Sequence, residues 1–413
     1  LSADAALSAS FGKDLTFSVR KLLLQSGSNT VEASGTDKDL AVRLSLPAIE
    51  KLWPDAKGSV SGKISVKGGM KDPVVNAEID IPLLRTAGIE VSGGSVRAES
   101  LKPMQKSGTL AVTASSLVAG GQDIRPDLRF SGTEKSHELT LSALSDLLTL
   151  RLAAAGGVKG DEWKGALSRL DLRSPEGSWS LRSPFPISYG LKSGELKGGE
   201  LSLVSGPSGV KVSGIRVKDG SGSLAAEIKS YDFARLRAFL PEDLSLKGLF
   251  DLKSTVAFGK KEDIRADFRT GTLTVTKDRT KVSLGGIDGK VSLRGGALDA
   301  GLRVSGAGGG LITADVKAQS IRDLRSRLSG SLKLTDLRLS EYRPLLADTL
   351  RKLEGRIGAD VRIGGTLGEP RLDGSVRLRG GKAETLENLV NVHDFTADID
   401  FSGLDASIKS SLK

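Results

Sequence analysis

The sequence contains no cysteine, which excludes disulfide bonds, thiolate metal ligands and a cysteine nucleophile. Histidine is almost as scarce, because His137 and His393 are the only two in 413 residues. Two isolated histidines make a poor metal or catalytic constellation, and no pair of acidic residues stands out as general acid and base. We therefore expect a protein that is not an enzyme and that uses no metal or other cofactor.

Aromatic residues and long apolar runs are also scarce. Phe, Tyr and Trp make up only 4% of the chain, against 38% hydrophobic residues and 51 glycines. The apolar residues are mostly Leu, Val, Ile and Ala, which suit a thin aliphatic lining better than a thick core. The longest uncharged stretch, 107–122, is rich in Ser, Thr and Gly and would make a poor membrane-spanning helix.

The formal charge of +10 comes from 60 basic and 50 acidic residues that are spread along the chain without a cluster. Such a distribution is typical of solvated strand faces. Few aromatic residues are available for base stacking, and no nucleic-acid-binding motif is present. We expect no nucleic acid partner.

What the sequence does contain is a regular alternation of apolar and polar residues. Leu148, Leu150 and Leu152 show the pattern, which is the period of a half-buried β-strand. Glycine-containing turns such as 92–94 and 294–296 separate the runs. Short strands with regular turn signals predict an antiparallel all-β architecture.

One block of sequence recurs. Residues 58–81 align without gaps to 355–378, and Pro73 then matches Pro370. A looser copy begins at Gly248 and lacks the proline. Each copy follows a short segment that we predict to be helical, and the repeat blocks cover 46–81, 231–275 and 339–378.

In the third block, one face of the predicted helix collects apolar residues at helical spacing. These residues are Tyr342, Leu345, Leu346, Thr349, Leu350 and Leu353. Between the blocks we find no convincing linker. The repeats without linkers predict that 1–413 form one continuous, elongated segment, which we expect to be part of a longer protein.

Three arrangements would cover the apolar face of such strands. The strands could form sandwiches, wind into a closed β-helix, or curl into an open trough that holds a ligand. Strand pattern does not separate these, although the smooth aliphatic composition favours the trough. The inward-facing residues predicted from parity are Val60, Ile64, Val66, Ile79, Ile81, Leu148, Leu150, Leu152, Val291, Leu293, Ile312, Val316, Val361, Ile363, Val376 and Leu378.

The stretch 161–189 resembles a signature of the TamB family, the inner-membrane part of the translocation and assembly module. It has Trp163, Gly165 two residues later, an alternating strand, and then Trp179 in a strand that ends near Pro184. The block 345–378 resembles the repeat shared by TamB and the wider AsmA-like proteins. The resemblance covers essentially the whole chain, without the family's N-terminal anchor and C-terminal domain.

The resemblance implies a curled antiparallel sheet with an open hydrophobic groove, a repeating β-groove or β-taco, with a few short helices. It implies a periplasmic location, with anchoring in the inner membrane through an N-terminal segment outside this chain. Phospholipid acyl chains would be the bound partner and would move between the inner and outer membranes. An outer-membrane β-barrel partner, bound through the C-terminal domain, and a role in assembling outer-membrane proteins are also implied. The alternative is a structural or adhesive β-solenoid with a closed, dry core.

Overall fold

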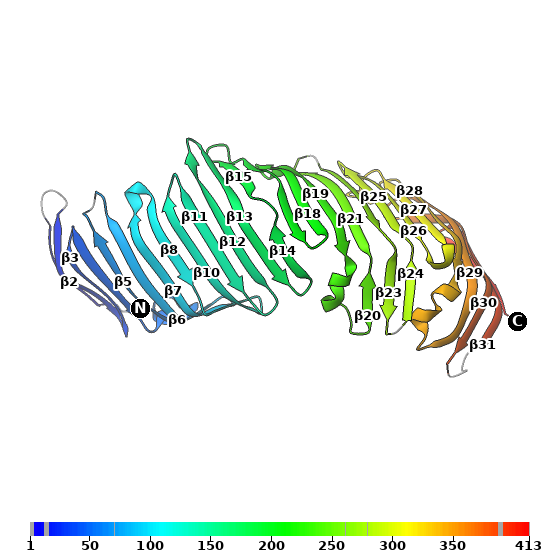
Figure 1. Ribbon diagram of the computed structural model, residues 1–413, viewed down its shortest axis with the longest axis horizontal. Coiled ribbons are helices and arrows are strands. Elements are labelled where there is room, and N and C mark those ends of the chain that lie inside the picture. The colour runs from blue at the N-terminus through cyan, green and yellow to red at the C-terminus, as the bar shows by residue number, and fades with distance from the viewer. Residues whose placement is uncertain are drawn as a thin grey trace. The chain divides into compact units, whose positions relative to one another are not determined.

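The computed structural model of the protein describes residues 4–11, 16–69, 71–260, 262–278, 280–386 and 391–412. Contacts divide the chain into unit 1, Leu1–Gly194, and unit 2, Glu195–Lys413. Both units consist of antiparallel strands joined by short turns (Figure 1), which confirms the predicted all-β fold class. The continuity of 1–413 as one groove segment stays a prediction.

Unit 1 is a meander of antiparallel strands. Its strands are β1 (Asp4–Phe11), β2 (Phe17–Ser26), β3 (Asn29–Thr36), β4 (Asp39–Leu46), β5 (Ala56–Lys67), β6 (Val74–Thr86), β7 (Ile89–Lys102), β8 (Ser107–Thr113), β9 (Ser116–Ala119), β10 (Gln122–Thr133), β11 (His137–Leu144), β12 (Thr149–Lys159), β13 (Glu162–Ser174), β14 (Gly177–Leu181) and β15 (Phe185–Gly190). Most strands pair with their sequence neighbours, while β10 pairs with both β8 and β9, and β13 with both β14 and β15.

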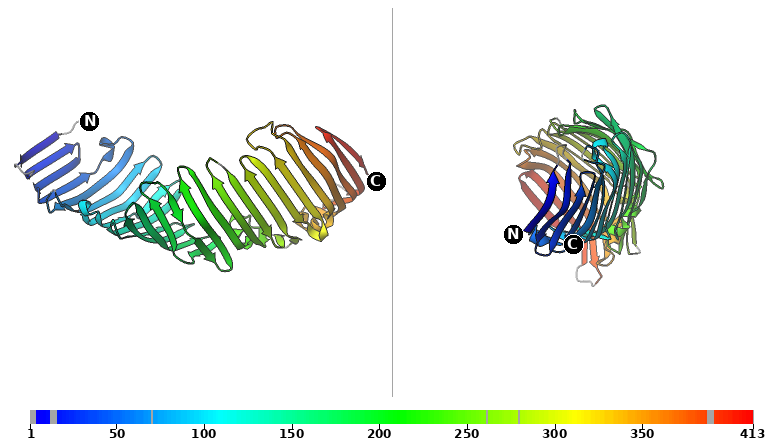
Figure 2. Two further views of the ribbon diagram at one scale, coloured as in Figure 1. Left: turned by 90° about the horizontal axis from the view of Figure 1, so that it is seen from above. Right: turned by 90° about the vertical axis from the view of Figure 1, so that its left-hand side faces the viewer.

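Unit 2 repeats this pattern and adds a small second sheet. Its strands are β16 (Leu196–Gly198), β17 (Leu201–Ser205), β18 (Ser208–Lys218), β19 (Ser221–Asp232), β20 (Leu244–Lys247), β21 (Leu249–Phe258), β22 (Asp263–Thr270), β23 (Leu273–Lys277), β24 (Thr280–Leu284), β25 (Ile287–Arg294), β26 (Ala297–Ser305), β27 (Leu311–Ala318), β28 (Leu328–Arg338), β29 (Leu350–Gly365), β30 (Pro370–Thr385), β31 (Asn391–Gly403) and β32 (Asp405–Ser411). Because β20, β23 and β24 pair among themselves, β21 lies directly beside β19 and β22 beside β25. Figure 2 shows the strands of each unit lying side by side in a curled sheet.

The helical segments of the described residues are short 3-10 helices. They are η1 (Ile49–Lys51), η2 (Pro103–Gln105), η3 (Phe233–Phe239), η4 (Ala307–Gly309), η5 (Leu339–Glu341) and η6 (Arg343–Leu346). Nowhere in the described part of the chain does a helix have the length and apolar character that crossing a membrane requires.

The amphipathic helix predicted in the third repeat block is wrong. The segment forms η5 and η6, and Leu350 already begins β29. Leu350 pairs with Thr385 and Leu353 with Ala383 on β30. Strand pairing satisfies the backbone of these residues, and tertiary pairing therefore overrides the helical spacing of their side chains.

The repeat copies share a backbone feature. Gly58, Gly248 and Gly355, which begin the aligned copies, have φ of 135°, 152° and 133°. A Cβ at Gly58 would lie 2.0 Å from the carbonyl oxygen of Leu83. Only glycine fits this conformation and this close approach, and the recurring glycine therefore has a steric cause.

Buried apolar side chains are few among the described residues. They are Ile49, Ala56, Ala98, Trp179, Phe185, Val282, Ala307, Ala318, Leu328 and Val361. The protein exposes 24896 Å². Two separate compact globules of half its mass would together expose only about 18,000 Å². The excess fits strands in a single layer, which leaves large parts of both sheet faces without a covering layer.

Candidate functional site

Antiparallel pairing lines up apolar side chains in rows that cross the strands of unit 1. Residues directly opposite one another in an antiparallel pair point to the same face of the sheet. Starting from Val42 on β4, each opposed residue up to β15 is apolar. The row is Val42, Ile64, Ala77, Ala98, Leu110, Phe130, Leu139, Ala154, Leu167 and Phe185.

Unit 2 has equivalent rows. One of them starts at Ile228 on β19 and reaches β31, with apolar residues or glycine at every position. It comprises Ile228, Leu252, Phe268, Gly289, Leu302, Ala314, Leu332, Val361, Gly374 and Phe401. These rows define the apolar face of each unit.

Bulges do not interrupt the apolar face, because the sequence compensates for them. On β28, Leu334 and Leu337 both belong to apolar rows although two polar residues separate them. The register shifts between these leucines, and Asp336 has a φ of 50°. An extra residue in one strand would turn every later side chain to the opposite face of the sheet. Because two consecutive polar residues stand at the bulge, the apolar side chains that follow return to the apolar face.

The structure places the sixteen predicted lining residues as follows. All except Leu148 lie in rows of the apolar face, opposite other apolar residues or glycine. Leu148 lies in the turn before β12, where its carbonyl accepts a hydrogen bond from the Ser145 N–H, and it is 40% exposed. Contact of these residues with lipid stays a prediction.

Selecting every second residue of the alternating runs missed several residues of the same face. Leu110, Leu139, Leu252 and Phe268 belong to the rows but are not among the sixteen lining residues that we predicted from the sequence. The same alternation marks them. The missing information was the register, which shows that neighbouring runs join into one face.

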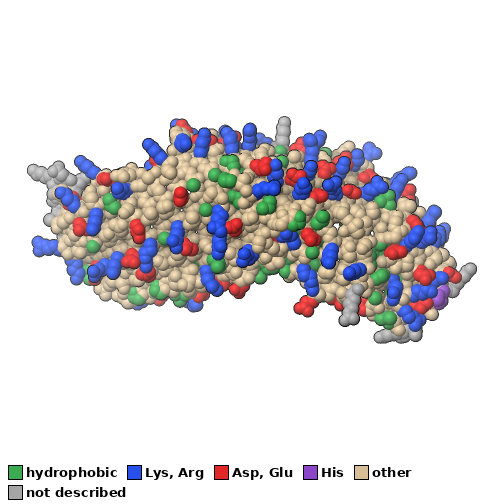
Figure 3. All heavy atoms as spheres, in the orientation of Figure 1, with side chains coloured by type: hydrophobic (Ala, Val, Ile, Leu, Met, Phe, Trp, Pro, Cys, Tyr) green, Lys and Arg blue, Asp and Glu red, His purple; other side chains and the backbone are tan. Residues whose placement is uncertain are grey.

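The opposite face is charged. In Figure 3 basic and acidic side chains are scattered over the visible face and apolar side chains are sparse. Cross-strand ion pairs there include Arg97 with Asp80 at 2.7 Å and Lys317 with Asp299 at 3.1 Å. Exposed pairs of this kind contribute about 0–1 kcal/mol each. Their main effect is to keep this face in water.

A hollow of about 940 Å³ lies on the main sheet of unit 2. Charged residues such as Lys253, Asp267 and Lys290 line it. Its lining also includes Leu252, Phe268, Leu302 and Ala314, which belong to the apolar row that starts at Ile228.

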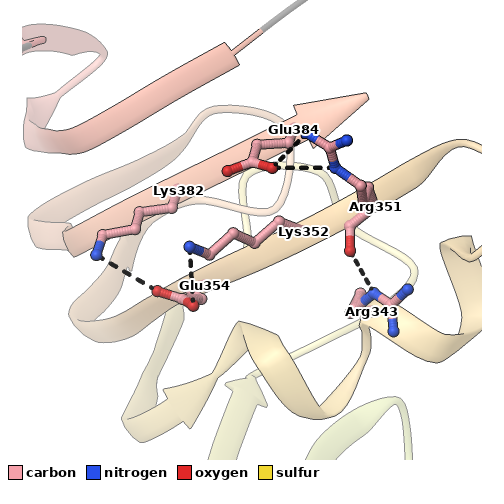
Figure 4. Close-up of polar contacts among 6 residues, drawn as sticks. All are labelled: Arg343, Arg351, Lys352, Glu354, Lys382 and Glu384. Atoms are coloured by element: carbon pink, nitrogen blue, oxygen red, sulfur yellow. Dashed lines mark hydrogen bonds and ion pairs between the residues drawn. The ribbon is translucent and has the colours of Figure 1, made fainter. Parts of the chain in front are cut away.

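A network of ion pairs ties the ends of β29 and β30 to η6 (Figure 4). Arg351 contacts Glu384 at 3.0 Å, and Arg343 donates to the carbonyl oxygen of Arg351 at 2.8 Å. Glu354 lies between Lys352 and Lys382, 3.6 Å from each amine. Each acid of the network is matched by nearby basic groups, which indicates a structural role.

Asp251 stabilises a bulge on β19. Its carboxylate accepts the backbone N–H of Ser230 at 2.8 Å, and Arg269 lies 3.2 Å away. Ser230 has a φ of 53°, and its carbonyl accepts the hydroxyl of the buried Ser208. The Ser230 hydrogen bond, together with Arg269, holds the pKa of Asp251 below its ordinary value.

The ion pair of Lys277 and Asp348 joins β23 to the segment after η6. The amine and carboxylate are 2.7 Å apart. Their hydrogen bond raises the pKa of Lys277 and lowers that of Asp348. Among the described residues, no group of three or more His, Cys, Asp or Glu side chains is arranged to hold a metal ion.

Together these features define a class: all-β proteins whose single-layer antiparallel sheets have one aliphatic and one charged face. The family model described as "TamB, N-terminal domain" matches residues 1–378. The chain belongs to the TamB family, which confirms the resemblance seen in the sequence.

A curated relative supports the same family. It is "Translocation and assembly module subunit TamB" of Haemophilus influenzae, 22% identical over 431 residues. The alignment covers 98% of this chain and 32% of the relative, so the chain spans about a third of that protein's length. No solved structure matches the chain.

Proposed function

We propose that this chain is a segment of a periplasmic bridge that carries phospholipids between the inner and outer membranes of a Gram-negative bacterium. The observation that carries the proposal is the apolar face itself. Its aliphatic rows cross strand after strand, as from Val42 to Phe185 in unit 1, and few of their side chains are fully buried. Phospholipid acyl chains are themselves aliphatic and would shield such a face from water.

The physical chemistry of the rows suits transport better than tight binding. Removing each methylene from water contributes about 0.8 kcal/mol, or roughly 12 kcal/mol for a 16-carbon chain. Interchangeable Leu, Val, Ile and Ala residues offer the chain a similar environment at each strand. A lipid can therefore move along the rows without meeting one deep minimum, while its headgroup stays in water.

The remaining parts of the proposal rest on the family. The curated relative is named as a subunit of a translocation and assembly module. For this protein we propose anchoring in the inner membrane and pairing with an outer-membrane β-barrel protein through parts outside the chain. We also propose a role in outer-membrane protein assembly, and no catalytic activity.

The second candidate is a structural or adhesive solenoid with a dry core. A β-helix closes its core by coiling, so that each strand lies beside the strand one coil later. The strands here instead run antiparallel beside their sequence neighbours, as β29 does with β28 and β30. This topology favours the open sheet that lipid transport needs.

The deciding experiment is native mass spectrometry of the chain purified gently from an envelope fraction, followed by lipid extraction. We expect several phospholipids per chain. Val291→Asp, in an apolar row of β25, should reduce bound lipid and transfer, while its neighbour Ser292→Asp on the charged face should not. A lipid-free protein with an intact β-sheet signal would favour the dry solenoid.

A further inference from the structure

One aromatic ring on the apolar face of unit 2 lies across the strand next to its own. Phe268 on β22 and Gly289 on β25 are directly opposed, in the row that starts at Ile228. A Cβ built on Gly289 would come 2.1, 2.4 and 2.7 Å from Cζ, Cε1 and Cε2 of the Phe268 ring. The ring therefore occupies the space that a side chain at position 289 would take, and Gly289 is buried although the sheet has a single layer.

Neighbouring rings hold Phe268 in this position. Phe250 on β21 points to the same face as Leu252, two residues later, and its ring centroid lies 6.3 Å from that of Phe268. The ring of Phe233 on η3 lies 5.8 Å from that of Phe250 in turn. The Phe268 ring thus has another ring on one side and the bare backbone of a glycine on the other, and it leans toward the glycine.

The same arrangement of a ring over a glycine occurs twice more on the apolar faces. In unit 1, a Cβ on Gly156 of β12 would come 2.5 Å from Cζ2 of Trp163 on β13. The indole is fixed there because its Nε1–H donates to Nε2 of His137 at 2.9 Å. In unit 2, Phe258 on β21 is directly opposite Gly222 on β19, where a Cβ would come 2.6 Å from Cζ of the ring.

A ring that lies across a glycine keeps the apolar face level. One side chain then fills two positions of the row, those of Phe268 and Gly289. An upright phenylalanine ring would rise above Leu252 and Leu302 of the same row, because its side chain is longer than that of leucine. An acyl chain that moves along the sheet must pass each strand in turn, and a ring that stands above its neighbours would obstruct it.

We propose that Gly289 is a positioning residue for lipid transfer, which keeps the ring of Phe268 low so that acyl chains can pass. Gly222 and Gly156 have the same role beneath their own rings. The inference rests on the proposed function, and it assigns residues that keep the path open rather than residues that bind lipid. The glycines act through the rings and need no contact with lipid.

Gly289→Ala in the full chain tests the role of this glycine. The three atoms nearest to the added Cβ all belong to the Phe268 ring, and the φ of Gly289 lies outside the left-handed region, so the ring must move and the backbone can stay. We expect the variant to carry a fluorescent phosphatidylethanolamine between donor and acceptor vesicles about tenfold more slowly than the wild type. Native mass spectrometry should still show as many bound phospholipids, because the aliphatic rows are intact.

A second substitution separates the ring from any other effect of the added methyl group. Gly289→Ala combined with Phe268→Leu removes the ring and should restore the wild-type transfer rate, and Phe268→Leu alone should transfer normally. Gly301→Ala on the next strand, opposite Lys290 and Asp315, meets no atom closer than 4.0 Å and is the matched control. Circular dichroism and urea unfolding establish that each variant is folded. If Gly289→Ala does not fold, Gly156→Ala with and without Trp163→Leu makes the same test in unit 1.

The outcomes separate this inference from the proposed function. If the glycine variant transfers lipid at the wild-type rate, or stays slow after the ring is removed, the positioning role is wrong and the proposed function stands. If bound lipid and transfer are lost together in a folded variant, the ring contributes to binding and not to clearance, which also overturns the inference. If the wild-type chain binds no lipid at all, both proposals fall.

Discussion

Val361 on β29 lies directly opposite Leu332 on β28, and only 5% of its surface is exposed. Its other opposed residue is Gly374 on β30, which has no side chain to contribute. Ile363, two residues later on the same face, is half-buried. The two positions therefore respond differently to the same substitution.

Val361→Asp should destabilise unit 2, because a buried carboxylate without a partner costs about 3 kcal/mol or more. Ile363→Asp should keep the fold, since its carboxylate can reach water, and should block lipid transfer. Urea unfolding and a donor-to-acceptor vesicle assay measure the two effects. Normal transfer by a folded Ile363→Asp protein would contradict the role of this row.

Replacing Asp251 should change the acid stability of unit 2. Its pKa is lower in the folded protein than in the unfolded chain. Its stabilising contribution is therefore fully present above about pH 4 and is lost as the pH falls through the folded-state pKa. Asp251→Asn should lose about 1–2 kcal/mol at pH 7 and show a shallower decline in stability below pH 4.

Acid-unfolding curves monitored by circular dichroism test this prediction. Asp299→Asn, which removes an exposed partner of Lys317, is the control and should change stability at pH 7 by less than about 1 kcal/mol. Parallel pH profiles for wild type and Asp251→Asn would show that the Ser230 contact contributes nothing to acid stability.

Two glycines of β29 should differ sharply in their tolerance of alanine. Gly355 has a φ of 133°, and a Cβ there would contact Gly381 at 3.2 Å. Gly364 has ordinary backbone angles and open space around it. We expect Gly355→Ala to cost about 1–3 kcal/mol and Gly364→Ala to be neutral or slightly stabilising. Thermal unfolding of both variants provides the comparison, and equal losses would contradict the steric explanation of the repeat glycine.

Gly165→Ala should displace the indole of Trp163. The added Cβ would come 2.5 Å from both the ring and the carbonyl oxygen of Ala155. We expect a loss of about 1–3 kcal/mol and a red shift of Trp163 emission as the ring moves toward water. Gly301→Ala has no neighbour closer than 4.0 Å and is the control. An unchanged emission spectrum would mean that the ring does not rest on Gly165.

Much of the fold could be predicted because the alternation of apolar and polar residues within a strand depends only on residues that are close in the sequence. The alternation around Val60, Ile64 and Val66 indicates one apolar face for that strand wherever its partners lie. The same reasoning failed at Leu148, where a turn ends the pairing. It failed also at Leu350 and Leu353, whose helical spacing was overridden by pairing with β30.

The sequence by itself determined the strand periodicity, the repeating glycines and the family, because these depend on residue order alone. Only the tertiary structure decided the register, which joins the separate runs into rows such as Ile228 to Phe401. It also brought His137 to Trp163 across β12. Contacts between residues distant in the chain depend on hydrogen-bond register and bulges, and a slip of one residue would turn each row to the opposite face.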